Sequence, residues 1–213
     1  IDGGPSERSK VCDAIAGVIR KHSATLAATQ RIPANIALLF NKDSDLLQRL
    51  LKMRTWMGDA EGMKPDVDYW YKQALRGAHL LYGGVGQDVG FVSPGADVSD
   101  LPVLHVTSCE LIDPDTADWL RAYVSGGGVL IAEFPFADRD DRTWIHPLRP
   151  GYGLNELLGC RELTREVTID APADVATFAQ GRQIRAEGWR VRLQPDDADP
   201  IAYWNDGSVA ATR

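Results

Sequence analysis

The sequence has little cysteine and no long apolar run. Three of its 213 residues are cysteines, and Cys12, Cys109 and Cys160 lie far apart with no C-x-x-C pair. An odd number of scattered cysteines excludes a disulfide framework and a cysteine-based zinc site, and it favours a reducing cytoplasm. Residues 1–9 contain no apolar signal core, and nowhere do 18 apolar residues follow one another. We therefore expect neither a secretion signal nor a membrane span.

Positive charge is in the minority. The chain has 23 Lys and Arg against 30 Asp and Glu, which gives a net charge of −7. Proteins that bind nucleic acid or anionic membranes gather Lys and Arg on one surface, and no basic stripe occurs in this sequence. With 44% hydrophobic residues, the composition is that of a globular protein with one large domain, or one domain and an appendage.

Two kinds of apolar pattern alternate along the first two thirds of the chain. Apolar residues at helical spacing follow Ser6, the expected N-cap, and predict a helix over 7–29 that ends before Pro33. Wholly apolar runs predict buried parallel strands at 36–40, 89–92, 103–107 and 129–132. Helical spacing recurs at 46–53, 67–82 and 114–124. The resulting order, β-α-α-β-β-α-β, predicts a doubly wound, flavodoxin-like α/β sandwich of three layers, with helices on both faces of a mostly parallel sheet.

The pattern changes after residue 160. Apolar and polar residues alternate, and Pro and Gly interrupt the segments 167–169, 175–178, 184–193 and 201–204. This alternation predicts antiparallel strands with one solvated face, appended to the α/β core.

Cys109 is the first candidate for chemistry. It follows the predicted strand 103–107, and open α/β sheets gather ligands and nucleophiles at the carboxyl ends of their strands. A nucleophile elbow needs small residues on both sides of the nucleophile, whereas Cys109 stands between Ser108 and Glu110. These neighbours favour a packed, small side chain over a catalytic thiol.

The histidines do not complete a catalytic set. A class I glutamine amidotransferase needs a His and a Glu two residues apart to orient and deprotonate its thiol. His146-Pro147 is followed by Leu148 where the Glu is needed, and a lone strand histidine such as His105 is typically a hydrogen-bonded core residue. No H-x-x-x-H pair occurs, so no metal site is predicted. Asp138, which stands among alternating charges after residue 133, indicates a solvated loop rather than a cation site.

Aromatic residues offer a second kind of function. Trp and Tyr are enriched both in sugar platforms and in subunit interfaces. Trp119 falls at helical spacing, which predicts a core position. The candidate interface residues are Trp56, Met57, Tyr69, Trp70 and Trp144.

Several short motifs, each weak alone, occur together in a fixed order. They are IALLFNKDS (36–44), DVSDLPVL (97–104), LIDPD (111–115), LRAYVSGGGVLI (120–131), PGYGLNELLG (150–159) and AYWNDG (202–207), followed by AATR (210–213). In this order they resemble the middle, trimerisation domain of glycoside hydrolase family 42 β-galactosidases. The fold of that domain is similar to class I amidotransferases but lacks their triad.

The resemblance implies a division of the chain. Residues 1–31 would be a linker and the terminal helix of a preceding catalytic barrel, 32–165 an amidotransferase-like α/β core, and 166–213 a β-rich extension that is truncated at its C-terminus. We therefore expect the chain to be part of a longer protein.

The resemblance also implies that the chemistry lies elsewhere. Retaining glycosidases need two carboxylates about 5 Å apart, and the family keeps both on the barrel. No catalytic, cofactor-binding or metal-binding residue is expected in this chain, and Asn155-Glu156 is interpreted as part of a helix. The implied partner is the chain itself, as a homotrimer, and the galactoside would be contacted mainly by the absent barrel.

The leading hypothesis is therefore a non-catalytic assembly domain that holds catalytic barrels in a ring. The competing hypothesis is an amidotransferase-like hydrolase that uses Cys109, with His105 or His146 as base within about 3 Å of a thiolate of depressed pKa. A third hypothesis is a carbohydrate-binding module, which needs an exposed Trp.

Overall fold

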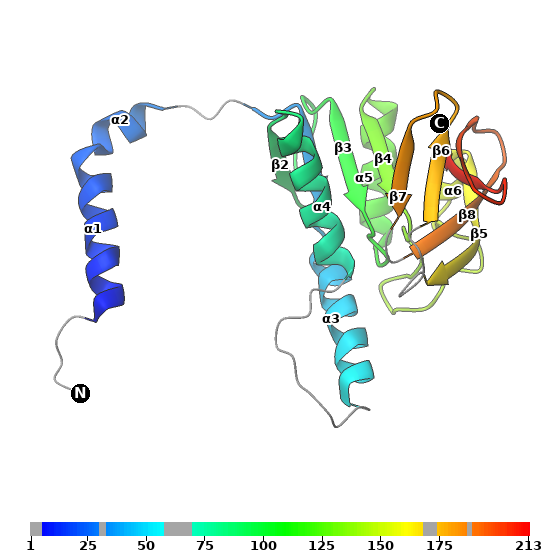
Figure 1. Cartoon of the computed structure of the whole chain (residues 1–213), viewed down its shortest axis with the longest axis horizontal. Coiled ribbons are helices and arrows are strands. Elements are labelled where there is room, and N and C mark those ends of the chain that lie inside the picture. Colours follow the sequence, from blue (N-terminus) through cyan, green and yellow to red (C-terminus); the bar gives the residue numbers. More distant parts are fainter. Residues whose placement is uncertain (1–5, 30–32, 58–69, 168–173, 187–188) are drawn as a thin grey trace. The chain divides into compact units, whose positions relative to one another are not determined.

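The computed structural model describes residues 6–29, 33–57, 70–167, 174–186 and 189–213 (Figure 1). For residues 52–57 and 167 it describes the backbone alone. The chain separates into two compact units, Ile1–Pro33 and Ala34–Arg213. Among the described residues, none of the helices combines the length and the apolar content that a membrane crossing needs.

The first unit contains two helices, α1 (Glu7–Lys21) and α2 (Ser23–Ala28). Ser6 is the N-cap of α1, as predicted, because its Oγ accepts a hydrogen bond from the Ser9 N–H at 3.1 Å. The predicted single helix over 7–29 is wrong, since the chain leaves helical geometry at His22 (φ −107°, ψ 16°). No residue of either helix is buried, and the apolar stripe of this unit is exposed at Val11, Ile15, Val18, Ile19 and Leu26.

The second unit begins with a four-stranded parallel sheet. Its strands are β1 (Ile36–Leu39), β2 (Val89–Val92), β3 (Val103–Thr107) and β4 (Val129–Glu133), in the order β2-β1-β3-β4. The helices between them are α3 (Lys42–Met57), α4 (Trp70–Gly84) and α5 (Pro114–Ser125). The predicted order β-α-α-β-β-α-β and the parallel pairing are thus confirmed, whereas the start of the predicted helix 67–82 lies outside the described residues.

The helices α4 and α5 belong to opposite faces of this sheet. The connections β1 to β2 and β3 to β4 run in opposite directions across the sheet, and right-handed crossovers place their helices on opposite faces. Tyr82 of α4 reaches His105 on one face, with 3.0 Å between the Tyr82 hydroxyl and His105 Nδ1. The Tyr123 hydroxyl of α5 donates to the carbonyl of Leu101, at 3.1 Å.

The prediction that helices cover both faces is wrong at β4. Ile131 pairs with His105 and lies on the face of α4, yet Ile131 is 40% exposed and Val129 is 55% exposed. The reason is the position of β4 at the edge of the sheet, beyond the strands β1, β2 and β3 that α4 contacts.

The core lies between the sheet and its helices. Side chains with essentially no exposure come from strands, helices and the segments after β3 and β4, and the largest include Tyr71, Phe136, Leu38, Leu39, Leu104, Ile112, Leu120 and Leu154. Gly128 lets the Tyr123 ring close over the end of α5, because a Cβ at Gly128 would stand 2.2 Å from that ring.

The C-terminal part forms a six-stranded antiparallel sheet after the short helix α6 (Leu154–Leu158), which contains Asn155 and Glu156. Its strands, in the order β5-β8-β10-β9-β6-β7, are β5 (Cys160–Val167), β8 (Trp189–Pro195), β10 (Val209–Thr212), β9 (Pro200–Trp204), β6 (Asp174–Phe178) and β7 (Gln183–Ala186). The antiparallel prediction is confirmed. Of the expected strand at 167–169, residues 168 and 169 lie outside the described residues, and residue 167 ends β5. The start of β5 at Cys160 is not predicted, because its alternating charged residues conceal it.

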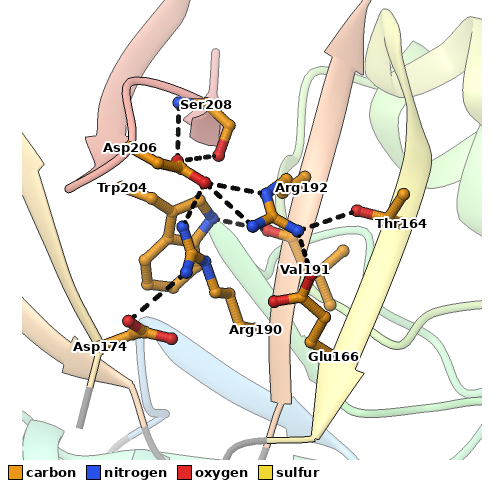
Figure 2. Close-up of polar contacts among 9 residues, drawn as sticks. All are labelled: Thr164, Glu166, Asp174, Arg190, Val191, Arg192, Trp204, Asp206 and Ser208. Carbon is orange, nitrogen blue, oxygen red and sulfur yellow. Dashed lines mark hydrogen bonds and ion pairs between the residues drawn. The ribbon is translucent and has the colours of Figure 1, made fainter. Parts of the chain in front are cut away.

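Two arginines of β8 join the strands of this sheet (Figure 2). Arg192 contacts Glu166 of β5 at 2.5 Å and Asp206 of the β9–β10 turn at 2.9 Å. Arg190 contacts Asp206 at 2.6 Å, and its guanidinium carbon lies 5.6 Å from the centre of the Trp204 ring. Hydrogen bonds from Ser208, together with Arg192, hold the pKa of Asp206 well below its usual range. Charge pairing thus supplements a small apolar core of Cys160, Val191 and Leu193.

Candidate functional site

The carboxyl edge of the parallel sheet is the place where a catalytic site would be expected. At the end of β3 the chain turns at Ser108, whose φ of +44° lies in the left-handed region that residues other than glycine seldom adopt. A nucleophile elbow uses such a strained turn. Ser108 therefore occupies the position that a nucleophile has in such an elbow, and Cys109 follows it. No local pattern indicates this turn, because glycine is absent on both sides of Ser108.

Ser108 has no catalytic partner among the described residues. Its Oγ is buried and makes no hydrogen bond in that part of the chain. A serine nucleophile needs a base within hydrogen-bonding reach of its hydroxyl. The turn therefore has the backbone shape of an elbow without the side chains that would activate it.

Cys109 is a packed residue. It has 0% exposure, and its Sγ lies 3.3 Å from the Ser44 hydroxyl. Burial raises the pKa of the Cys109 thiol to about 12, and the carboxylates of Glu110 and Asp43 act in the same direction. A nucleophilic cysteine needs the opposite, an accessible thiolate of depressed pKa. The structure therefore supports the packed interpretation of Cys109.

Neither candidate base contacts the Cys109 sulfur. His105 is 3% exposed; its Nδ1 faces the Tyr82 hydroxyl and its Nε2 lies 3.1 Å from a Glu133 carboxylate oxygen. The prediction of a hydrogen-bonded core histidine is confirmed. The His146 ring packs edge-on against Tyr152, with 4.5 Å between the ring centres.

A buried network of charges fills the carboxyl edge instead. Arg165 of β5 binds Asp138 and also Glu162, the latter at 2.5 Å. Glu162 also pairs with Arg149, at 3.1 Å. Asp138 is 4% exposed, so the solvated position expected for it is wrong. This network joins the loop after β4 to the first strand of the antiparallel sheet.

A third buried carboxylate, that of Glu110, continues the network toward α3. Glu110 accepts a hydrogen bond from the Gln48 side chain at 2.7 Å, and Gln48 accepts one from the Tyr71 N–H at 2.7 Å. Burial raises the pKa of Asp138 to about 6, although Arg165 opposes this, and burial also raises the pKa of Glu110.

This arrangement is suited to holding segments together rather than to catalysis. Glu110, Asp138 and Glu162 are each less than 10% exposed, and their described partners are other side chains of the network. A glycosidase needs two carboxylates that face an open substrate cleft. Among the described residues, no group of three or more His, Cys, Asp or Glu side chains is placed to hold a metal ion.

The candidate interface residues have very different positions. Trp56 and Met57 belong to the last turn of α3, whose side chains lie outside the described residues, and Tyr69 lies outside them entirely. Trp70 is half-buried at the start of α4. Trp144 is 75% exposed. The sequence-based expectation that these residues form an interface stays a prediction.

Hydrogen bonds close a turn over residues 140–144, which we call the Trp144 turn, and the Trp144 side chain on it is exposed to water. The Asp140 side chain accepts hydrogen bonds from the N–H groups of Arg142 at 3.0 Å and Trp144 at 2.8 Å. The backbone closes the turn through the Asp140 N–H and the Trp144 carbonyl, at 3.0 Å. Thr143 has φ +67°, an unusual conformation for a β-branched residue. The turn therefore fixes the backbone of an exposed tryptophan at the cost of local strain.

Fold and site together define an α/β domain with an antiparallel extension, a filled carboxyl edge and an exposed tryptophan on a rigid turn. Residues 34–213 match the family model described as the β-galactosidase trimerisation domain. The chain belongs to this family, which confirms the resemblance found in the sequence motifs.

Three similar proteins are each longer than the chain. A curated relative, the β-galactosidase Bga of Halorubrum lacusprofundi, is 28% identical over 86% of the chain and 26% of its own length. A β-galactosidase structure from Bacillus circulans sp. alkalophilus has a TM-score of 0.75 at 14% identity, over 99% of the chain and 31% of its own. A GH42 β-galactosidase structure from G. stearothermophilus has a TM-score of 0.74 at 18% identity, over 99% of the chain and 29% of its own length. The chain thus spans about a quarter of the curated relative.

Proposed function

We propose that this chain is the assembly domain of a family 42 β-galactosidase and that it holds three catalytic barrels in a ring. The match of residues 34–213 to the trimerisation-domain model carries this proposal. The filled carboxyl edge supports it, because the described residues offer no open set of catalytic side chains. The retaining carboxylate pair and most galactoside contacts then lie on a barrel outside this chain, in a cytoplasmic enzyme.

The proposal includes the fold and the division of the chain. The parallel order β2-β1-β3-β4 agrees with the first four strands of the flavodoxin order 2-1-3-4-5, which supports a flavodoxin-like, amidotransferase-like core over 32–165. Residues 1–31 would lead in from the barrel. The β-rich extension expected at 166–213 would include all of β5, which begins at Cys160. The exposed apolar stripe of α1 supports the first assignment, because an amphipathic helix of this kind needs a partner.

Self-association would use aromatic and aliphatic anchors surrounded by polar residues. The candidates remain Trp56, Met57, Tyr69, Trp70 and Trp144. Of the two whose side chains are described, Trp70 and Trp144, the more exposed is Trp144. A closed ring of three needs heterologous contacts, so each copy must present two different patches.

Sedimentation velocity of the full-length protein, combined with hydrolysis of a chromogenic galactoside, tests this function. We expect a trimer that hydrolyses the galactoside, and a Cys109→Ala variant that keeps both properties. A full-length protein that stays monomeric across a 100-fold concentration range would contradict the proposal. Loss of hydrolysis in the trimeric Cys109→Ala variant would instead favour the amidotransferase-like alternative.

A further inference from the structure

The parallel sheet has an open edge at β4. The Val129 N–H donates a hydrogen bond to the Pro102 carbonyl at 3.0 Å, so the backbone groups of Val129 face β3. Successive residues of a strand direct their backbone groups to opposite sides, so the N–H and C=O groups of Leu130 and Ala132 point away from β3. In the described part of the chain these outward groups have no hydrogen-bond partner. The edge of β4 is therefore free to pair with a further strand.

The side chains of β4 are more exposed than those of the neighbouring strands. Each of its five residues is at least partly exposed, whereas three of four residues in β1 and four of five in β3 are buried. Val129 and Ile131, at 55% and 40% exposure, are apolar. Parallel sheets are normally covered on both faces, so this exposure indicates a sheet that continues beyond β4.

β4 also lacks the features that protect a free edge strand. Such strands usually carry Lys, Pro, inward-pointing charges or a bulge, each of which prevents pairing with another strand. β4 is apolar up to Glu133, and its register with β3 is continuous. The edge strands of the antiparallel sheet differ, because β5 has charged residues and an irregular register between Glu162 and Thr164, and β7 carries Arg185. β4 therefore has the character of an inner strand.

The place beside β4 is where the flavodoxin order continues. In the order 2-1-3-4-5 a fifth parallel strand lies beside the fourth, whereas β5 of this chain belongs to the antiparallel sheet. A second copy of the chain does not suit this place in a trimer. Two β4 edges would pair around a twofold axis, and β4 paired with β2 of another copy would extend the sheet without closing it, so neither arrangement forms a ring of three.

A segment of the same polypeptide suits the place better. The chain spans about a quarter of the curated relative, so a full-length protein of that kind has ample polypeptide outside residues 1–213. A segment that is covalently joined to the sheet is present at a high effective concentration, and its pairing needs no separate association step.

We propose that an extended segment of the full-length polypeptide, outside residues 1–213, pairs with β4 and completes the parallel sheet. This inference rests on the proposed function, because it takes the chain to be one domain of a longer protein. The segment bonds the outward backbone groups of Leu130 and Ala132, and it places apolar side chains beside Val129 and Ile131.

Hydrogen exchange of the full-length protein tests the pairing. We expect the amides of Leu130 and Ala132 to exchange roughly 100-fold more slowly than unbonded amides, because a bonded strand amide exchanges only when the sheet opens locally. The amide of Val129, which bonds to Pro102, is the internal reference. If Leu130 and Ala132 exchange as fast as unbonded amides while Val129 is protected, the inference is overturned.

A lysine on β4 tests the apolar part of the contact. Ile131→Lys places a charge where the segment packs, so it should speed the exchange of Leu130 and Ala132 roughly tenfold. Ile184→Lys is the matched control, because Ile184 is 57% exposed on the edge strand β7, and it should leave these rates unchanged. Equal rates in the two variants would contradict a covered edge. Thermal unfolding of both variants confirms that they fold.

Photo-crosslinking of the full-length protein identifies the occupant of the edge. A benzophenone amino acid in place of Ile131 should link to a peptide from outside residues 1–213. In assemblies formed from equal amounts of isotopically light and heavy protein, the two linked peptides should carry the same label. Links between light and heavy peptides would assign the edge to a second copy and overturn the inference, as would links to residues 1–213 alone.

The outcomes distinguish this inference from the function on which it rests. Sedimentation measures assembly independently of the cross-links. A trimer with links between light and heavy peptides would keep the assembly function and overturn the completed sheet. A monomer whose links stay within one chain and reach outside residues 1–213 would overturn the assembly function and support the completed sheet.

Discussion

Two arginine–carboxylate networks in the same unit differ in their exposure to water. Arg165 holds Asp138 and Glu162 at the carboxyl edge, where both carboxylates are less than 10% exposed. On the antiparallel sheet, Arg192 holds Glu166 and Asp206, whose side chains are 52% and 43% exposed. The chemical groups are the same, yet desolvation makes an unpaired charge costly only in the first network. The exposure of its carboxylate partners therefore decides how much each arginine contributes to the free energy of unfolding.

The largest effect is expected when the buried network loses its arginine. Arg165→Ala leaves Asp138 and Glu162 buried without this partner and should lower the free energy of unfolding by about 3–5 kcal/mol. Urea denaturation measures the loss. Arg161→Ala is the matched control on the same strand, because Arg161 pairs with an exposed Asp196 at 3.5 Å and should contribute little. Equal losses in the two variants would remove the distinction between the networks.

A second prediction compares a buried and an exposed cysteine. A thiol with a pKa of about 12 rather than 9.0 holds about 1,000-fold less thiolate near neutral pH, so Cys109 should resist alkylation in the folded chain. Cys12 is exposed and should react. Mass spectrometry of peptides after iodoacetamide treatment measures both sites. Alkylation of Cys109 at the rate of Cys12, without unfolding, would restore Cys109 as a candidate nucleophile.

The third prediction concerns pH. The pKa of Asp138 is raised to about 6 from an ordinary 3.8, so the folded chain binds this proton more tightly than the unfolded chain does. Its contribution to stability therefore falls as the pH rises through the window from 4 to 6. Acidification from pH 7 to pH 5 should stabilise the wild type by about 1 kcal/mol relative to Asp138→Asn.

Asp206 is the contrast for this pH experiment, because its pKa is lowered and the sign reverses. The contribution of Asp206 to stability is present at pH values above the ordinary pKa of aspartate, and it is lost only as the pH falls below about 4. Chemical denaturation at several pH values measures the free energy of unfolding of wild type relative to Asp138→Asn and to Asp206→Asn. As the pH rises, this difference should fall for Asp138→Asn and rise for Asp206→Asn. Identical pH profiles for wild type and Asp138→Asn would contradict the raised pKa.

The smallest effect is expected in the exposed network. Arg192→Ala removes contacts to Glu166 and Asp206, and exposed ion pairs of this kind contribute little. The loss should shrink further in 1 M salt, where charges are screened within about 3 Å. Thermal unfolding at low and high salt measures it. A loss as large as that of Arg165→Ala, or one that salt leaves unchanged, would show that packing around Arg192 is more important than its charge.

The elements of the α/β core could be predicted because each carries a local pattern. The run Ile36–Leu39 is apolar throughout and forms a strand that is buried at three of its four residues. Asp113 caps α5, accepting from the Thr116 N–H at 2.7 Å, and Pro114 begins that helix. Such signals lie within a few residues of one another, so no knowledge of the tertiary fold is needed to find them.

The carboxyl edge could not be predicted in the same way. Asp138 and Arg165 are 27 residues apart and lie in segments whose alternating charges suggest solvent exposure. The strain at Ser108 arises where the chain leaves β3, and its neighbours Thr107 and Cys109 give no local sign of it. The exposure of Trp144 likewise depends on how the Asp140 side chain closes its turn.

The sequence by itself determined the kinds of element, their order, the parallel and antiparallel halves and the family, because local periodicity, capping and motif order are properties of short segments. Only the tertiary structure decided which charges are buried, that Cys109 cannot ionise readily, and that the Trp144 side chain is exposed on a closed turn. Burial and distance depend on which segments meet, and a polar side chain has the same letter in the sequence whether water or a guanidinium surrounds it.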